Sequence, residues 1–210
     1  MRRAMATNSD SDDSPLILGI GGTTRAGSAS ERALRHVLAH ARALGARTEL
    51  LTGPQLVLPI YVPSEGERDV AVHALVSALR RATGIVVASP GYHGSLSGLI
   101  KNALDYAEDL RDDQPPYFED RAVGLIACAT GWQATGATLA ALRSIVHALR
   151  GWPTPLGVAV NTSECRFDAE DRPSSPAIDR QLQILAAQVV RFAEQRAAWE
   201  RASARAALAH

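Results

Sequence analysis

The chain has 210 residues, 46% of them hydrophobic, and its 22 basic residues balance 22 acidic ones. This length is enough to bury one sizeable core and fits one domain better than two. A net charge of zero lacks the basic excess typical of proteins that bind nucleic acids or membrane surfaces, so neither partner is expected.

The N-terminal segment and the cysteines indicate the cellular compartment in which the protein is expected. The arginines at the start are followed by no apolar stretch of the kind that a secretory signal needs. No apolar run approaches the ~20 residues of a membrane span. Cys128 and Cys165 form no CxxC motif, which disfavours a metal site and a disulfide framework and favours a reducing compartment. We therefore expect a cytoplasmic protein that binds no metal.

Residues 1–15 are polar, acidic and end in proline, which predicts a disordered tail before a single domain over residues 16–210. Within the domain, apolar runs typical of buried strands alternate with apolar residues at helical spacing. The predicted strands cover residues 16–20, 47–51, 84–88, 122–129 and 156–160. The apolar faces of the predicted helices lie within residues 34–44, 70–82, 96–107, 139–149 and 178–192.

Five strands that are each followed by a helix predict a doubly wound α/β fold, in which a five-stranded parallel sheet has helices on both faces. In such sheets, ligands bind beyond the carboxyl ends of the strands, at the point where the strand order reverses. The loops after the first, third and fourth strands are therefore the expected places for a binding site.

The loop after the first strand, residues 21–30, offers four hydroxyl groups and the guanidinium of Arg25. A helix follows, and its N-terminal N–H groups and partial positive charge favour an anion. Arg25 can add a charge-assisted hydrogen bond to a phosphate. These features predict a phosphate-binding loop.

Three other interpretations of this loop are weaker. The GxxxxG spacing of a P-loop begins at Gly22, but Ser28 stands where a P-loop needs a lysine. A dinucleotide-binding GxGxxG pattern begins at Gly19, but its third glycine position holds Thr24. An N-cap role for Ser28 or Ser30 explains one hydroxyl and leaves the threonines, the arginine and the glycines unexplained.

The loop after the third strand reads SPGYHGSLSGLIKNALD over residues 89–105. It resembles the loop P-E-Y-N-G-S-x-x-G-x-L-K-N-A-x-D of the NADPH-dependent FMN reductase family, which includes flavin, quinone and chromate reductases and small azoreductases. The first loop is also similar to the family's G-S-x-R-x-x-S pattern, with Thr23 in place of its serine and with Arg25 and Ser28 matching. The resemblance spans about residues 16–195.

This resemblance implies a flavodoxin-like fold that binds FMN and passes a hydride from NADPH to FMN and then to a flavin, a quinone or a similar small acceptor. It also implies a homodimer or homotetramer. The residues that it assigns to the FMN phosphate are Thr23, Arg25, Ser28 and Ser30. Those that it assigns to the isoalloxazine ring are Pro90, Gly91, Tyr92, His93 and Gly94.

Two positions depart from the family's pattern, because Gly91 replaces its glutamate and His93 replaces its asparagine. Backbone contacts survive both changes, whereas a contact from the asparagine amide would have to be made by the imidazole. In the family, a glycine-bearing loop after the fourth strand packs along the flavin. The candidates there, for the flavin or the nicotinamide, are Thr130, Gly131, Trp132 and Gln133.

The sequence contains no Ser/His/Asp set, nucleophile elbow or paired carboxylates, so no catalytic side chain is expected and the cofactors carry the chemistry. Residues 53–68 and 115–118 are predicted to line the side of the flavin ring at which the electron acceptor binds. Cys128 is predicted to be inert packing. The histidines predicted to lie on helices and to be solvated are His36, His40, His73 and His147.

Two other functions compete with the reductase. A flavodoxin-type electron carrier would bind FMN without NADPH reductase activity, but such carriers are strongly acidic and this chain is neutral. A domain that has lost its flavin and serves as an interaction module would have no reason to keep the Arg25 and Tyr92 loops.

Overall fold

The computed structural model describes residues 14–63 and 68–207. Five parallel strands form a sheet in the order β2-β1-β3-β5-β6, and the short β4 pairs antiparallel with the end of β3. This confirms the predicted doubly wound α/β fold, to which the structure adds the β3–β4 hairpin. The strands are β1 (Leu16–Gly21), β2 (Arg47–Thr52), β3 (Gly84–Tyr92), β4 (Ser95–Leu96), β5 (Ala122–Ala129) and β6 (Trp152–Asn161).

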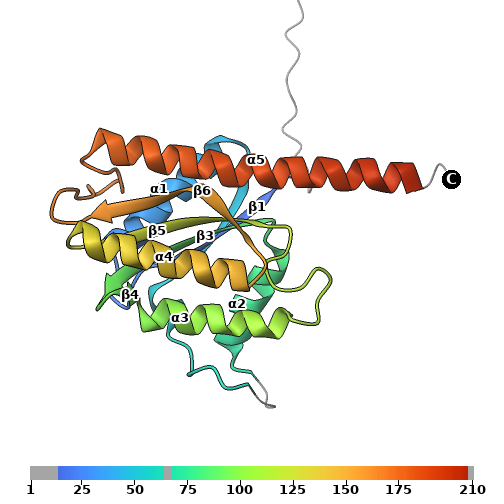
Figure 1. Ribbon diagram of the computed structural model, residues 1–210, viewed down its shortest axis with the longest axis horizontal. Coiled ribbons are helices and arrows are strands. Elements are labelled where there is room, and N and C mark those ends of the chain that lie inside the picture. Colours follow the sequence, from blue (N-terminus) through green and yellow to red (C-terminus); the bar gives the residue numbers. More distant parts are fainter. Residues whose placement is uncertain (1–13, 64–67, 208–210) are drawn as a thin grey trace, which may run out of the picture.

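Helices cover both faces of the sheet, as predicted. Figure 1 shows α1 and α5 on one face and α2, α3 and α4 on the other. Short 3₁₀ turns follow β2 (Gly53–Leu56) and α3 (Tyr106–Leu110). The helices are α1 (Ala29–Ala43), α2 (Val70–Arg81), α3 (Gly98–Asp105), α4 (Trp132–Ala148) and α5 (Pro176–Ala207).

The central strands are apolar throughout because both of their faces are covered. All eight residues of β5 are buried, and so are the first seven of β3. Two glycines of these strands let α5 approach closely. A Cβ at Gly84 or Gly124 would lie 2.8 or 3.0 Å from side-chain carbons of Val189, so neither position accepts a side chain without displacing the helix.

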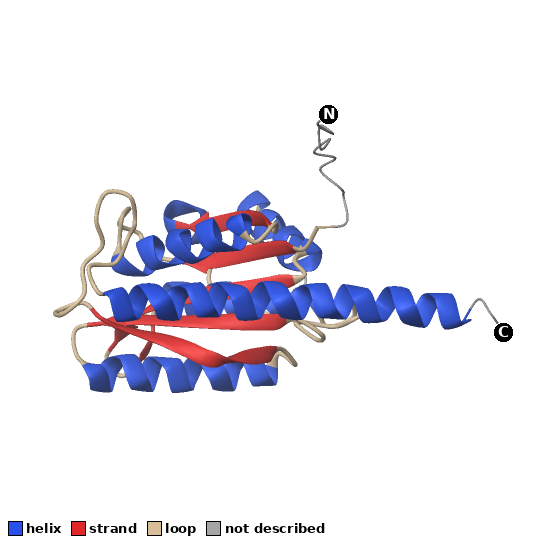
Figure 2. Cartoon of the chain, turned by 90° about the horizontal axis from the view of Figure 1, so that it is seen from above, coloured by secondary structure: helices blue, strands red, loops and turns tan. Residues whose placement is uncertain are grey.

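Several elements extend beyond their predicted bounds, β6 and α5 among them. β6 begins at Trp152 rather than at residue 156, and it tolerates Pro153 and Pro155 because it is an edge strand. α5 continues to Ala207, well past the predicted apolar face, and its last buried residue is Ala193. Figure 2 shows that the C-terminal part of this helix projects beyond the sheet.

The predicted tail, residues 1–15, lies outside the described residues except for its last two. Within residues 14–63 and 68–207, no helix is both long and apolar enough to cross a membrane.

Candidate functional site

A cavity of about 330 Å³ lies beyond the carboxyl ends of β1, β3 and β5. In the sheet, β2 lies on one side of β1 and β3 lies on the other, so the strand order reverses direction here. This is the switch point where a ligand site was expected. The predicted site residues that line it are Thr23, Arg25, Ser28, Ser30, Pro90, Gly91, Tyr92 and Thr130. Lining residues that the motifs did not include are Ala29, Cys128, Ala129, Ala134 and Thr162.

Ser28 begins α1 and also faces this cavity. Its Oγ accepts a hydrogen bond from Glu31 N at 3.3 Å and lies 3.4 Å from Ser30 Oγ. Ser28 is therefore an N-cap, as one of the alternative interpretations held. The cap engages only the N–H of Glu31, so the N–H groups of Ala29 and Ser30 remain at the helix terminus to face an anion.

Two charged side chains outside the predicted site hold the loop before α1 in place. Glu31 Oε2 accepts a hydrogen bond from Gly27 N at 2.9 Å, and Arg32 Nε donates one to Gly27 O at 3.0 Å. Gly27 has a φ of 68°, a conformation that favours glycine. Arg32 Nη1 also pairs with Asp171 at 3.0 Å, which ties the loop to the segment before α5. The Ser-x-x-Glu spacing of a capping box is the signal that points to Glu31.

Thr23 and Arg25 form the outer wall of the phosphate end. Thr23 Oγ1 accepts a hydrogen bond from Arg25 N at 3.1 Å and lies 3.0 Å from Arg25 O, so the hydroxyl orders the turn. Arg25 is exposed and lines the cavity. Among the described residues, its guanidinium forms no ion pair, which leaves the charge available for an anion.

The loop after β3 is a two-residue hairpin. Tyr92 pairs with Ser95, and the residues between them, His93 and Gly94, have φ values of 50° and 89°. Positive φ at both positions is the requirement of a type I′ turn. His93 and Gly94 are exposed and do not line the cavity. Their assignment to the flavin ring stays a prediction, and the visible role of both residues is to shape the turn that presents Tyr92.

The structure gives a physical reason for glycine at position 91. A Cβ there would lie 2.6 Å from Thr138 Oγ1, 3.1 Å from the Ala129 Cβ and 3.3 Å from Ala134 O. Thr138 is buried, and its Oγ1 donates a hydrogen bond to Ala134 O at 2.8 Å. Because α4 packs this tightly on the end of β3, the glutamate of the family's pattern has no room here unless α4 moves.

The loop after β5 is held by the end of β6. Gly131 N donates a hydrogen bond to Asn161 Oδ1 at 3.0 Å, and Trp132 Nε1 donates one to Glu164 Oε1 at 3.0 Å. Trp132 is 53% exposed, so it is not a core tryptophan, and neither it nor Gly131 lines the cavity. Asn161 and Glu164 were missed by the motifs because they follow the last strand and reach the loop only through the fold.

The Lys-Asn-Ala-x-Asp part of the long motif has a structural role. Asn102 Oδ1 accepts a hydrogen bond from Tyr61 N at 2.8 Å, and Asn102 Nδ2 donates one to Pro59 O at 2.8 Å. Lys101 pairs with Asp105 one turn later on α3. Asn102 therefore fixes the backbone of the loop between β2 and α2.

Two further expectations concern residues near the ring. Phe118 is wholly buried in the core, and none of residues 115–118 is among those lining the cavity, so the predicted wall on the acceptor side is not found there. Cys128 lines the cavity floor, where burial, with a smaller contribution from Cys165, raises the pKa of its thiol to about 12. The thiol therefore stays protonated near pH 7, as expected of inert packing.

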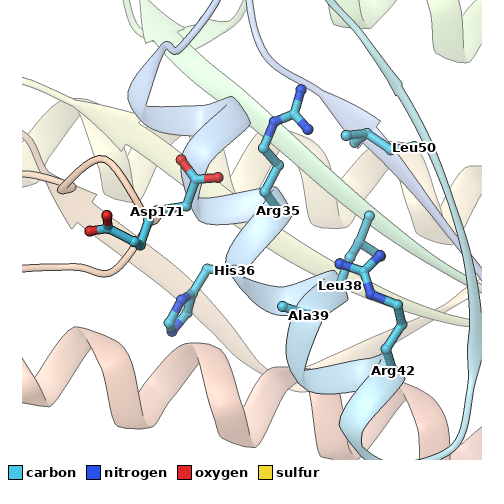
Figure 3. A pocket seen from close by; sticks show the side chains of 8 residues that line it. Arg35, His36, Leu38, Ala39, Arg42, Leu50 and Asp171 are labelled. Carbon is cyan, nitrogen blue, oxygen red and sulfur yellow. The ribbon is translucent and has the colours of Figure 1, made fainter.

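The prediction that the helical histidines are solvated is wrong for His36, which is 9% exposed. Its ring lies between α1 and α5, and its Nε2 contacts Asp179 Oδ1 of α5 at 2.6 Å in place of water. His36 also borders a depression of about 220 Å³ beside α1, which Figure 3 shows with Arg35, Arg42 and Asp171 around it. This depression shares no lining residue with the cavity at the sheet edge.

Comparison with known proteins agrees with the architecture of this site. The family model for NADPH-dependent FMN reductases matches residues 15–164. An NADPH azoreductase from Bacillus sp. (strain OY1-2) is 37% identical over 75 residues, 35% of this chain and 39% of that protein. An FMN-dependent NADPH-azoreductase from Staphylococcus saprophyticus is 37% identical over 93 residues, 44% of this chain and 46% of that protein. The chain thus spans less than half the length of these curated relatives.

Two solved structures share the fold. FerB, a flavoenzyme NAD(P)H:(acceptor) oxidoreductase from Paracoccus denitrificans, has a TM-score of 0.69 at 18% identity, over 87% of this chain and 98% of that one. An oxidoreductase from Corynebacterium diphtheriae has a TM-score of 0.65 at 18% identity, over 87% and 98% of the two chains. The family model covers most of this chain, including the loops after β1 and β5 and the end of β3, which line the cavity, and the chain therefore belongs to the NADPH-dependent FMN reductase family.

Proposed function

We propose that this chain is an FMN-dependent NAD(P)H oxidoreductase that passes a hydride from NADPH to FMN and then reduces a small acceptor. The observation that carries the proposal is the single cavity in which the polar loop before α1 meets the β3–β4 hairpin, in a chain of this family. Flavins and quinones are the expected acceptors, and azo compounds join them because the two curated relatives described above are azoreductases.

The size and the chemistry of the cavity support this proposal. Its volume of about 330 Å³ lies within the roughly 300–1,000 Å³ of small-molecule sites. One end combines Arg25, the hydroxyls of Ser28 and Ser30 and the N-terminus of α1, which suits one terminal phosphate. The other end is formed by Pro90, Gly91 and Tyr92, where backbone groups can meet the polar edge of a flat ring.

In this proposal the protein binds, orients and shields the reactants. Bound FMN would supply hydride chemistry of its own, which a protein needs only to position. Arg25, Ser28 and Ser30 hold the phosphate, and Gly91 and Tyr92 position the ring. Gly131 and Trp132 stay candidates for the nicotinamide, since Trp132 is exposed on the loop next to Thr130, which lines the cavity.

The assembly and the location of the protein belong to the same proposal. We expect a homodimer or homotetramer on the strength of the family resemblance. We expect a cytoplasmic protein because both cysteines are free and buried, as is usual in a reducing compartment.

Anaerobic stopped-flow mixing of the FMN-loaded protein with NADPH tests the proposal. The flavin absorption band should bleach, and a substoichiometric amount of protein should then consume NADPH when a quinone or an azo dye is added. Dithionite serves as the control for a reducible flavin. If dithionite bleaches the flavin but neither NADPH nor NADH does, the protein is an electron carrier and the reductase proposal fails.

A further inference from the structure

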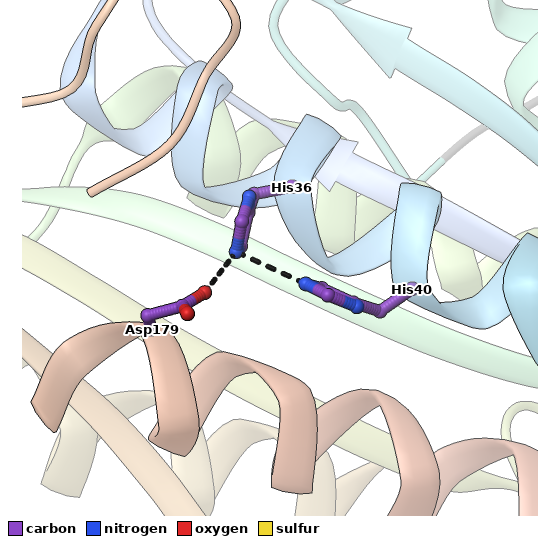
Figure 4. Close-up of side chains that lie close together, drawn as sticks. All are labelled: His36, His40 and Asp179. Atoms are coloured by element: carbon purple, nitrogen blue, oxygen red, sulfur yellow. Dashed lines mark hydrogen bonds and ion pairs between the residues drawn. The ribbon is translucent and has the colours of Figure 1, made fainter. Parts of the chain in front are cut away.

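Three potential metal ligands meet between α1 and α5, away from the FMN cavity (Figure 4). His36 and His40 are one turn apart on α1, and Asp179 lies in the first turn of α5. His36 Nε2 is 2.6 Å from Asp179 Oδ1, and His40 Nε2 is 3.1 Å from His36 Nε2. One ligand atom from each residue lies within 4.8 Å of the other two. The Nε2 atoms of the two imidazoles therefore face each other beside one carboxylate.

Hydrogen bonding among these groups is incomplete whichever tautomers the neutral rings adopt. A ring nitrogen carries either one hydrogen or one lone pair. If His36 Nε2 donates to Asp179, it has no lone pair to accept a hydrogen from His40. If instead it accepts from His40, its lone pair faces the carboxylate at 2.6 Å. A cation at this point removes the conflict, because it accepts a lone pair from all three atoms.

We propose that His36, His40 and Asp179 bind a divalent transition-metal ion, Zn²⁺ being the one that fits best. Two imidazoles and a carboxylate are a common ligand set for Zn²⁺. Metal–ligand bonds of about 2.0–2.2 Å in a tetrahedron place neighbouring ligand atoms roughly 3.3 Å apart. The present contacts of 2.6 and 3.1 Å need to open slightly, and the ligand atoms of His40 and Asp179, which lie within 4.8 Å of each other, need to settle at the same spacing.

The surroundings provide support and access. Gln183 Nε2 donates a hydrogen bond to Asp179 Oδ2 at 2.9 Å, which holds the carboxylate with its other oxygen toward the histidines. A cavity of about 460 Å³ opens onto the three ligands and leaves room for a water as the fourth. Asp168, which also lines this cavity, is already paired with Arg172 at 2.9 Å and is not counted as a ligand.

The proposed ion has a structural role. Zn²⁺ has no redox chemistry of its own, and the three ligands share no position with the lining of the FMN cavity. The ion would join the middle of α1 to the start of α5. It would thereby stabilise the face of the sheet that α1 and α5 cover. The loop that carries the predicted phosphate site precedes α1, so it would be supported as well. This inference does not depend on the reductase proposal.

Calorimetric titration of the EDTA-treated, full-length chain with ZnCl₂ tests the site. We expect one saturable site per chain. His40→Ala and Asp179→Asn should each weaken binding at least 100-fold, more than the roughly 10- to 100-fold typical of losing an outer-shell partner. His147→Ala, which changes an exposed histidine of α4, is the matched control and should bind like the parent.

Thermal unfolding gives a second readout that is independent of activity. Zn²⁺ at about 100 times its dissociation constant should raise Tm by about 5 °C or more in the parent and leave Tm of His40→Ala unchanged. Far-UV circular dichroism establishes that His40→Ala is folded, as expected for a partly exposed residue. Absence of saturable Zn²⁺ binding, or equal binding by the parent and His40→Ala, would overturn the proposal.

Discussion

Among the residues that the structure describes, Arg25 is the one positively charged side chain that lines the proposed FMN cavity. The other arginines near the loop are already engaged, since Arg32 pairs with Asp171 at 3.0 Å and Arg35 with Glu31 at 2.7 Å. The two pairs fix the loop, and the buried carboxylate of Glu31 leaves little further positive charge at the helix terminus. Phosphate binding should therefore depend strongly on Arg25.

Replacing Arg25 with alanine should weaken FMN binding while the fold stays intact. Loss of one charge-assisted hydrogen bond costs about 1.5–3 kcal/mol, which is roughly a 10- to 150-fold increase in Kd. Quenching of flavin fluorescence during titration of the apo protein measures Kd. Arg42→Ala, which changes an arginine of α1 that lies outside the cavity, is the control. An unchanged Kd for Arg25→Ala would show that the phosphate binds elsewhere.

At the scale of elements, the contact between β3 and α4 explains a departure from the family's pattern that the sequence alone could not explain. Gly91 belongs to β3 and Thr138 to α4, and the space between them is too small for a Cβ. A substitution at one position should therefore depend on the residue at the other.

Gly91→Ala should lower the free energy of unfolding by about 1–3 kcal/mol through overpacking. Thr138→Ala removes the nearest atom, so the double variant should lose less than the sum of the two single variants. Urea unfolding of the four proteins yields the coupling energy. Strict additivity would mean that Gly91 is not limited by Thr138.

Most helices and strands could be predicted because their sequences contain the local pattern of apolar residues that is typical of each. β3 and β5 are unbroken apolar runs, as strands buried on both faces must be. The outer part of α5 escaped prediction because the apolar spacing ends at Phe192, although the alanines and charged residues that follow favour a helix by propensity alone. β4 was missed because a two-residue strand has no period to detect.

The residues of the candidate sites likewise include some that could be predicted from the sequence and some that could not. Residues of the loops after β1 and β3 were predicted, because each loop is one continuous motif. Thr162, Glu164 and Asp179 were not, because each approaches its partner only through the tertiary fold. His36 and His40 already have the spacing of one helical turn, but their carboxylate partner is far along the chain. Spacing within a motif therefore reveals a phosphate loop more readily than a ligand set shared by two helices.

At the scale of the whole molecule, the proposed FMN cavity joins segments that are distant in the sequence. The end of β3 and the loops after β1, β5 and β6 each contribute lining residues. A ligand that binds all of them stabilises the folded chain as a unit, because the unfolded chain does not bring these loops together. FMN should therefore protect the protein against thermal unfolding, and its phosphate should account for much of the effect.

FMN at about 100 times its dissociation constant should raise Tm of the apo protein by about 5 °C or more. Riboflavin at the same concentration has the same ring without the phosphate, so it should raise Tm far less in the parent. In Arg25→Ala the advantage of FMN over riboflavin should shrink, because the missing guanidinium acts only on the phosphate. Differential scanning fluorimetry of the two proteins with each ligand provides the four values. Equal stabilisation by FMN and riboflavin in the parent would contradict a phosphate site at the start of α1, while leaving the ring-binding end of the cavity to be tested separately.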